Sequence, residues 1–129
     1  MDVDSSTLSR VAVVIPAYKP SLSGNEFLSF ERCRRVLNRH PRLLVVPESL
    51  DTAWYLQRDP ALTIQRFDDR FFTSVMAYSE LCCLPIFYEA FLAYEFMLIY
   101  QLDCYVFEDR LESWCRRGHD YVGPPWPNY

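Results

Sequence analysis

The sequence predicts an α/β fold, in which helices flank a mostly parallel, Rossmann-like sheet. Short apolar runs alternate with segments of helical periodicity along its 129 residues, and this alternation is typical of βαβ units. Half of the residues are hydrophobic and 16% are aromatic, so the chain can bury a single core. Residues 1–10 are acidic and rich in serine, and we expect them to be disordered. One domain is therefore expected over residues 11–129.

Apolar runs that end at turn residues identify the expected strands. Residues 11–15 and 43–46 are each followed by a proline, Pro16 and Pro47, which cannot donate a hydrogen bond to a ladder. Residues 96–100 carry no charge, as suits an inner strand that is covered on both faces. The remaining expected strands are residues 62–64 and a short final piece, residues 120–123.

Capping residues mark where the helices begin. Ser23 and Glu26 form a capping-box pattern, and the helix that follows should end before Pro41. Pro85 fits the first turn of a helix that continues to Tyr94. Side-chain caps predict three further helices, after Asp51 (residues 53–56), after Ser74 (75–84) and after Asp109 (through Trp114, stopping at Gly118).

Composition argues against several classes of function. With three glycines, the sequence has neither GxGxxG nor a P-loop, so a dinucleotide-binding oxidoreductase or a P-loop kinase is not expected. Five cysteines without a CxxC pair, and only two histidines, argue against a zinc site or a disulfide framework. The net charge of −4 gives no reason to expect nucleic acid as a partner. One group of arginines is interpreted first as a solvated helix face and second as an anion patch: Arg32, Arg34, Arg35, Arg39 and Arg42.

The sequence also predicts where the protein resides. No run approaches the roughly 18 apolar residues of a membrane span, and residues 1–10 lack the pattern of a signal peptide. We therefore expect a cytoplasmic protein without a membrane span.

The most informative single residue is Asp103, which follows the apolar run that begins at Phe96. Ligands of open α/β sheets bind outside the carboxyl ends of such strands. A dry and unpaired carboxylate would be costly there, so a cation or a hydrogen-bond donor is expected to meet it. Asp103 is therefore either a metal or ligand contact or the cap of the next turn.

Four segments, in this order, resemble a little-characterised glycosyltransferase-like family with the GT-A fold. They are residues 13–20 (VVIPAYKP), 46–51 (VPESLD), 100–107 (YQLDCYVF) and 120–126 (DYVGPPW). The resemblance implies a Rossmann-like nucleotide-diphospho-sugar transferase fold with a donor site at the carboxyl ends of the strands. Such enzymes continue into a segment that supplies the acceptor site and a catalytic base. We therefore expect the C-terminal acceptor part to be missing from these residues, and no catalytic base is assigned.

The resemblance implies which residues would surround the nucleotide. Pro16, Ala17 and Tyr18 would line the nucleoside pocket, and Glu48 would contact the base or the ribose. Arg66 could reach a donor phosphate. The alternatives are loop packing for Pro16 and Tyr18, a surface acid flanking a helix for Glu48, and an ion pair with a neighbouring aspartate for Arg66.

The resemblance also implies a metal site and a sugar site. Gln101 and Asp103 stand where GT-A enzymes carry the Asp-x-Asp pair that holds Mn²⁺ or Mg²⁺ against the diphosphate. Because Gln101 is neutral, Asp103 would bind a cation that it shares with the phosphates. Tyr78 and Ser79 would contact the sugar, and the alternative for Tyr78 is a place in the core.

The expected function is thus transfer of a sugar from a nucleoside-diphosphate sugar to an unknown acceptor, by the donor-binding part of a glycosyltransferase. UDP is the expected nucleotide, from the resemblance alone. The alternative is a non-catalytic nucleotide-binding or protein-interaction module with the same fold. An incomplete sheet could also favour self-association.

Overall fold

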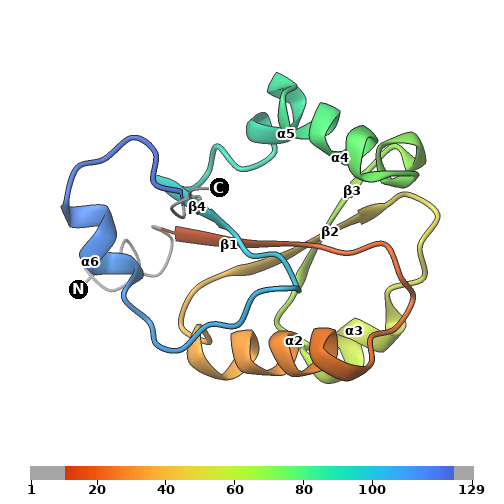
Figure 1. Ribbon diagram of the computed structural model, residues 1–129, viewed down its shortest axis with the longest axis horizontal. Coiled ribbons are helices and arrows are strands. Elements are labelled where there is room, and N and C mark those ends of the chain that lie inside the picture. Colours follow the sequence, from red (N-terminus) through yellow and green to blue (C-terminus); the bar gives the residue numbers. More distant parts are fainter. Residues whose placement is uncertain (1–10, 124–129) are drawn as a thin grey trace, which may run out of the picture.

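The computed structural model describes residues 11–123 and contains one four-stranded sheet (Figure 1). The strands are β1 (Val11–Pro16), β2 (Arg42–Pro47), β3 (Thr63–Phe67) and β4 (Phe96–Ile99). All of their pairings are parallel, and their order is β3-β2-β1-β4. The expected α/β fold with a parallel, Rossmann-like sheet is therefore confirmed for this part of the chain. The expectation that residues 96–100 form an inner strand was wrong, because β4 lies at an edge of the described sheet and its residues are half-buried or exposed.

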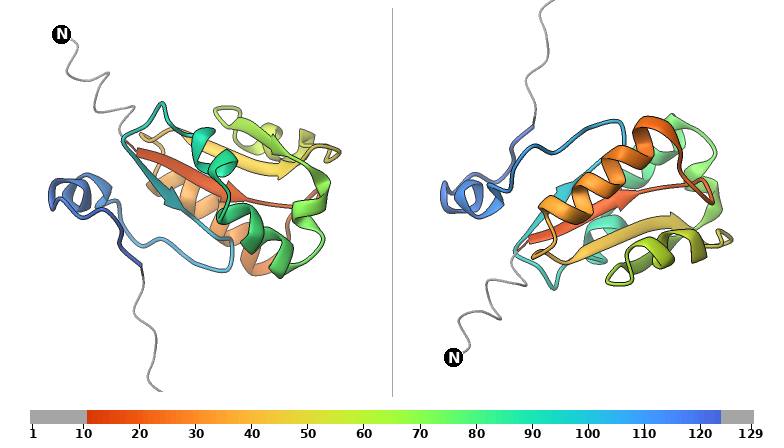
Figure 2. Two further views of the ribbon diagram at one scale, coloured as in Figure 1. Left: turned by 90° about the horizontal axis from the view of Figure 1, so that it is seen from above. Right: turned by 90° about the horizontal axis from the view of Figure 1, so that it is seen from below.

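Helices cover both faces of the sheet (Figures 1 and 2). On one face lie α2 (Gly24–Val36) and α3 (Ala53–Arg58), and on the other lie α4 (Val75–Cys82) and α5 (Pro85–Glu89). The short 3₁₀ helix η1 (Asp69–Phe72) precedes α4.

Two apolar clusters fill the space between the sheet and the helices. Because successive side chains of a strand point to opposite faces, Val13 and Ile15 of β1 pack with the cluster that contains Phe30 of α2. Their neighbours Ala12 and Val14 belong to the other cluster, with Leu81, Phe87 and Phe91 from α4, α5 and the turn after them. Residues 11–15 of β1 are at most 2% exposed, which explains why their sequence is apolar at every position.

Most of the expected helix starts are confirmed. Ser74 Oγ accepts a hydrogen bond from the Ala77 N–H at 3.0 Å, and Asp51 accepts one from the Ala53 N–H at 3.0 Å. The carboxylate of Asp109 likewise accepts the N–H of Leu111, at 3.2 Å, before α6 (Leu111–Arg116). Ser74, Asp51 and Asp109 therefore each accept a hydrogen bond from an N–H group in the first turn of the helix that follows, as their positions predicted.

Two expectations about the helices were wrong. Ser23 is the residue that precedes α2, but its side chain makes no capping hydrogen bond. Glu26 instead bonds Lys19, so the capping box does not form. The helix expected over 85–94 ends at Glu89, and tighter turns follow in which Phe91 N–H bonds Tyr88 O and Tyr94 N–H bonds Phe91 O.

The expected strand at residues 120–123 is also absent from the described chain, since these residues are exposed and unpaired in the sheet. Tyr121 is 86% exposed and Val122 is 54% exposed. A four-residue run with a glycine has little intrinsic preference for a strand unless a neighbouring strand pairs with it. Residues 1–10, expected to be disordered, and residues 124–129, which include the end of the DYVGPPW segment, lie outside the described residues.

Within residues 11–123, no helix is both long enough and apolar enough to cross a membrane. The cytoplasmic location stays a prediction.

Candidate functional site

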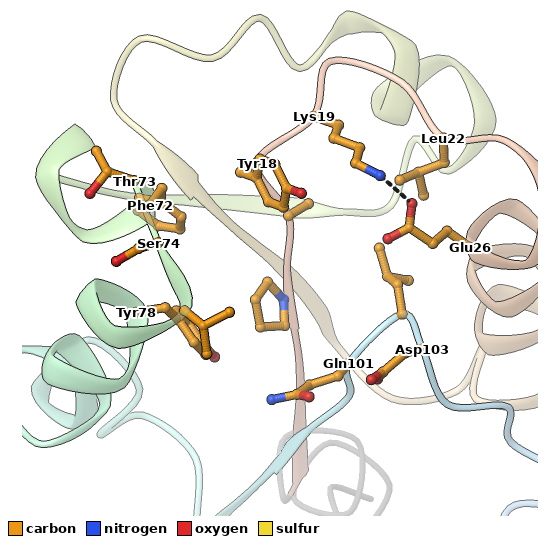
Figure 3. Close-up of a pocket in the computed structure, with 14 residues that line it drawn as sticks. Tyr18, Lys19, Leu22, Glu26, Phe72, Thr73, Ser74, Tyr78, Gln101 and Asp103 are labelled. Atoms are coloured by element: carbon orange, nitrogen blue, oxygen red, sulfur yellow. Dashed lines mark hydrogen bonds and ion pairs between the residues drawn. The ribbon is translucent and has the colours of Figure 1, made fainter.

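The site lies where the strand order changes direction. From β1 the chain moves through β2 to β3 on one side, and it then returns to place β4 on the other side of β1. In open α/β sheets this arrangement leaves a crevice beyond the carboxyl ends of the two strands at the reversal. A pocket of about 590 Å³ lies at this position (Figure 3). Its lining residues are Pro16, Ala17, Tyr18, Lys19, Leu22, Glu26, Phe72, Thr73, Ser74, Val75, Tyr78, Gln101, Leu102 and Asp103.

The segment after β1 forms one wall, and its backbone is held in place. The N–H of Ala17 bonds the carbonyl of Val45 in β2, at 2.9 Å. The hydroxyl of Tyr55, a fully buried residue of α3, donates to the carbonyl of Lys19 at 2.6 Å. Ala17 is buried, whereas the Tyr18 ring is 60% exposed at the pocket. A rigid backbone therefore presents an aromatic ring and a lysine to the pocket.

A turn after β4 forms the second wall and carries Asp103. Cys104 N–H bonds Gln101 O at 2.9 Å, which closes the turn. Leu102 is buried at 7% exposure, while Gln101 and Asp103 are exposed and line the pocket. Figure 3 shows both side chains leaving the same turn, across the pocket from α4. Asp103 is therefore a pocket residue, as its position after an apolar strand predicted.

Two residues hold this turn against α2. The Tyr100 hydroxyl lies 2.8 Å from Ser29 Oγ and 3.0 Å from the Ser29 carbonyl. Ser29 Oγ also donates to the carbonyl of Cys104, at the end of the turn. Burial raises the pKa of Tyr100, so its hydroxyl stays neutral at physiological pH. Ser29 and Tyr100, which fix the turn, are buried and do not line the pocket, whereas Gln101 and Asp103 line it.

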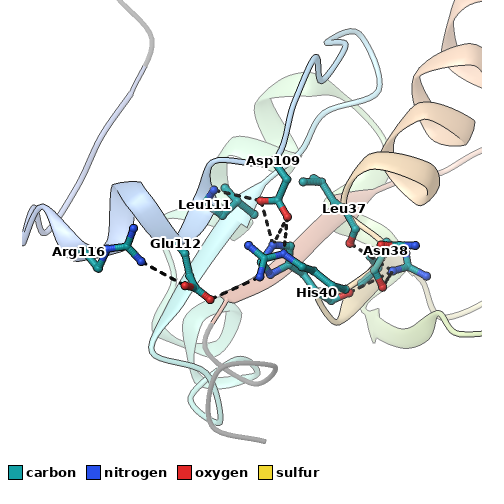
Figure 4. Close-up of polar contacts among 9 residues, drawn as sticks. Leu37, Asn38, His40, Asp109, Leu111, Glu112 and Arg116 are labelled. Carbon is teal, nitrogen blue, oxygen red and sulfur yellow. Dashed lines mark hydrogen bonds and ion pairs between the residues drawn. The ribbon is translucent and has the colours of Figure 1, made fainter. Parts of the chain in front are cut away.

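From this turn the chain runs back along α2. We call the turn and the segment that follows it, residues 101–110, the strap. Arg32 of α2 donates to the carbonyls of Val106 at 2.9 Å and Phe107 at 2.8 Å. At the far end, Asp109 accepts hydrogen bonds from Arg39 at 2.7 Å and from His40 Nε2 at 2.9 Å (Figure 4). The strap is thus tied to α2 and to the segment after it along its whole length.

The start of α4 forms the wall opposite the strap. Thr73 and Ser74 lead into the helix, and Figure 3 shows both on the side of the pocket away from Glu26. Tyr78 lies one turn further on; its hydroxyl is buried and, among the described residues, has no hydrogen-bond partner. Burial, with the Cys82 side chain as a smaller cause, raises the pKa of Tyr78, so the phenol is neutral.

The charged residues that line the pocket within the described part of the chain are one lysine and two acids, Lys19, Glu26 and Asp103. Lys19 Nζ lies 2.9 Å from Glu26 Oε1, and both side chains are partly exposed. Glu26 raises the pKa of Lys19, which therefore carries a full charge at neutral pH. The pocket is thus mildly negative, with Asp103 as its carboxylate outside the ion pair.

The donor atoms of the pocket fit a divalent cation only in part. Within residues 11–123, no group of three or more His, Cys, Asp or Glu side chains could hold a metal ion. Asp103 and the Gln101 amide offer oxygen ligands, as Mg²⁺ and Mn²⁺ prefer. Such a pair suits a cation that a bound phosphate also coordinates, and the cation remains a proposal.

Three of the expected site residues lie outside the pocket. Glu48 follows β2, and its N–H bonds the Phe67 carbonyl in β3 at 3.0 Å. Arg66 lies in β3, and its Nη1 donates to three carbonyls at the end of β2 and in the turn after it, at 2.8 to 3.1 Å. Ser79 is exposed on α4 but does not line the pocket. The structure therefore brings together Pro16, Ala17, Tyr18, Tyr78, Gln101 and Asp103, and not these three.

Sequence reasoning missed Lys19, Glu26, Thr73 and Ser74 as pocket residues. Lys19 could have been found, because it is the only lysine of the chain and lies four residues after the end of the strand expected over residues 11–15. Glu26 was interpreted as part of a capping box, and Ser74 does cap α4. A capping role gives no sign that a residue also faces a pocket.

The family comparison covers the second half of this site. Residues 61–129 match the family model described as a protein of unknown function (DUF5672). The match includes the residues that α4 and the strap contribute to the pocket. No curated protein and no solved structure matches the chain. Because the matched region is more than half of the sequence, the chain belongs to the DUF5672 family.

Proposed function

We propose that the pocket binds the nucleoside diphosphate of a nucleotide-sugar donor, and that the chain is the donor-binding part of a GT-A-type glycosyltransferase. The observation that carries this proposal is the pocket at the reversal of strand order, with Asp103 in its wall. This is where open α/β sheets bind ligands. The resemblance of four sequence segments to glycosyltransferase-like proteins supplies the reaction class.

Each wall of the pocket has a chemical part in this proposal. Pro16, Ala17 and Tyr18 offer an apolar and aromatic surface for the nucleoside. Gln101 and Asp103 offer oxygens to a Mg²⁺ or Mn²⁺ ion held jointly with the phosphates. When bound, that ion would neutralise negative charge on the leaving diphosphate. Tyr78 lies across the pocket, in place for a contact with the sugar, and the acceptor is unknown.

A second candidate is a nucleotide-binding or protein-interaction module without transfer activity. The observation that favours it concerns the two carboxylates that the described residues place in the pocket, since Glu26 is paired with Lys19 and Asp103 would hold the proposed cation. Transfer of a sugar to a hydroxyl usually needs a base, and Glu26 of the pocket is engaged by Lys19. Asp103 would then be required both for the cation and as a base. Nucleotide binding without hydrolysis of the donor would support this candidate.

The test is calorimetry of UDP, GDP, CDP and dTDP, with and without Mn²⁺, on wild type and Asp103→Asn. We expect binding of one nucleotide that depends on Mn²⁺ and falls about tenfold or more in Asp103→Asn, since a charged ligand to the cation is lost. Glu89→Gln removes an exposed carboxylate of α5 outside the pocket and should bind as wild type does. At a hundredfold excess over Kd, the nucleotide should stabilise the fold by about 2.7 kcal/mol.

Absence of nucleotide binding by folded wild-type protein would overturn the proposal. Equal losses in Asp103→Asn and Glu89→Gln would show that the loss reflects net charge and not the pocket. Hydrolysis of the corresponding nucleotide sugar, lost in Asp103→Asn, would favour the glycosyltransferase over the binding module.

A further inference from the structure

Among residues 11–123, Lys19 is the one cationic residue that lines the pocket, and its ion-pair partner is another pocket residue, Glu26. Figure 3 shows the two side chains meeting on the side of the pocket that also carries Asp103. Both are partly exposed, at 45% for Lys19 and 38% for Glu26. An ion pair so open to water contributes little to stability, so it can exchange partners readily.

The backbone of Lys19 does not share this freedom. Its carbonyl accepts the hydrogen bond from Tyr55, and Ala17 two residues earlier is bonded to β2. The side chain of Lys19 can therefore change its partner while its backbone stays in place, at the carboxyl end of β1. An ammonium group is a compact charge with three rotatable donors, which suits a phosphate oxygen.

The charge of the pocket makes such a group necessary for a phosphorylated ligand. Glu26 and Asp103 would both repel a diphosphate. A cation beside Asp103 would compensate the charge of that carboxylate. The charge of Glu26 is compensated by Lys19 instead. While Lys19 is bound to Glu26, its charge is shared with a carboxylate and is only partly available to a ligand.

We propose that Lys19 is the phosphate contact of this pocket, and that it exchanges Glu26 for a phosphate oxygen when a ligand with a diphosphate binds. Glu26 thereby acts as an internal competitor that lowers the affinity for phosphate. This inference deepens the proposed donor site, on which it rests for the nucleotide but not for the phosphate chemistry.

Because Lys19 is the only lysine, its ammonium group gives the only lysine signal of the labelled protein. Reductive methylation with ¹³C-formaldehyde keeps the positive charge and labels Lys19 and the terminal amine, which serves as an internal control. We would titrate the labelled protein with inorganic pyrophosphate, UDP and uridine in the presence of Mg²⁺, and follow both signals by NMR. The Lys19 signal should move, with saturation, for pyrophosphate and UDP but not for uridine.

Variants test the roles of the two residues by affinity. Lys19→Gln should lower the affinity for pyrophosphate and for UDP by about tenfold or more, because a charge-assisted hydrogen bond is lost. Glu26→Gln should raise the affinity for both ligands by about two- to fivefold, because the competing carboxylate is removed. Lys19→Arg should recover part of the affinity. Arg35→Gln, an exposed change of the same charge on α2, should match wild type.

The outcomes separate this inference from the proposed function. UDP binding with a stationary Lys19 signal and unchanged Lys19→Gln affinity would overturn the inference and leave the donor site standing. Movement with pyrophosphate but no binding of any nucleotide would sustain the inference and overturn the nucleotide proposal. A Lys19 signal that moves with neither pyrophosphate nor UDP overturns the role of Lys19 in phosphate binding.

Discussion

At the scale of single residues, the strongest structural constraint is the buried ion pair of Arg42 and Asp59. Arg42 is 5% exposed and Asp59 is 3% exposed. Two parallel hydrogen bonds join them, Nε to Oδ2 at 2.8 Å and Nη2 to Oδ1 at 2.9 Å. Arg42 Nη1 also donates to backbone carbonyls between α2 and β2, including that of Asn38 at 3.0 Å. One guanidinium thus joins the start of β2, the end of α2 and the end of α3.

Removal of one partner of this pair should be strongly destabilising. Asp59→Asn leaves the Arg42 charge buried without its counter-ion, and we expect a loss of about 3–5 kcal/mol in the free energy of unfolding. Urea denaturation measures it. The double variant Arg42→Met with Asp59→Leu should recover most of the loss, because no buried charge remains. A loss in Asp59→Asn below about 1 kcal/mol, the range of surface pairs, would contradict this account.

The sequence could predict only part of this at the residue scale. The residues after β1 and β4 were expected in the pocket and lie there, because an apolar run and its end are readable from periodicity. Arg42 was grouped with a solvated helix face, yet it is buried, because its partner Asp59 is brought near by folding. Glu48 and Arg66 were expected at the site, but Glu48 follows β2 and Arg66 lies in β3, away from the pocket, and sequence alone does not give the order of strands.

At the scale of elements, the strap determines where Asp103 lies. The contacts of the strap with α2 and the segment after it join residues about seventy positions apart, such as Arg39 and Asp109. Periodicity predicts α2 but cannot predict a connection of this separation. Asp109 was correctly expected to begin the last helix, since it accepts the Leu111 N–H. Its second role, as the anchor of the strap to Arg39 and His40, needed the structure.

The anchor predicts a dependence of stability on pH. Burial raises the pKa of Asp109, but hydrogen bonds from Arg39, Leu111 and His40, with the His40 charge, outweigh it and hold the pKa below its ordinary value. A carboxylate whose pKa is lower in the folded state stabilises the fold above its unfolded pKa, near 4, and this contribution is lost as pH falls through the folded value. Asp109→Asn should therefore be less stable than wild type at pH 7, by about 1.5–3 kcal/mol.

Denaturation of both proteins between pH 2 and pH 7 checks this prediction. The difference between wild type and Asp109→Asn should shrink below about pH 4, because protonated Asp109 resembles the amide in charge. Asp120→Asn, a change in an exposed residue, is the matched control and should show no such difference. A stability difference that is the same at every pH would mean that the Asp109 charge is not what holds the strap.

At the scale of the whole molecule, burial is concentrated in the centre of the sheet. Val13, Val14, Leu44 and Val45 are fully buried, whereas α6 buries Cys115 as its one buried residue within the described chain. Large apolar side chains remain exposed over α4 and the segments that follow, as at Met76 and Leu92, each 77% exposed. This apolar surface is compatible with self-association, which stays a prediction.

The distribution of burial predicts a hierarchy of local opening. Amide groups open locally where few apolar contacts must be broken, and only by global unfolding in the core. Hydrogen exchange should therefore be slowest in β1, which is paired on both sides, and fastest in α6 among the helices. Residues 101–104 should be intermediate, because Ser29 and Tyr100 hold the turn although three of its four residues are exposed. Tyr100→Phe removes the hydroxyl that meets Ser29 and should speed exchange in this turn while leaving β1 unchanged in rank.

This hierarchy places the candidate site at a boundary between rigid and mobile parts. Its β1 wall rests on the slowest part of the molecule, and its strap wall depends on side-chain hydrogen bonds that can open separately. A ligand that contacts both walls should then slow exchange in residues 101–104 more than in β1, because stabilisation is visible only where local opening precedes global unfolding. Uniform slowing over both walls would mean that the strap opens only with the whole fold, and the site would then be preformed throughout.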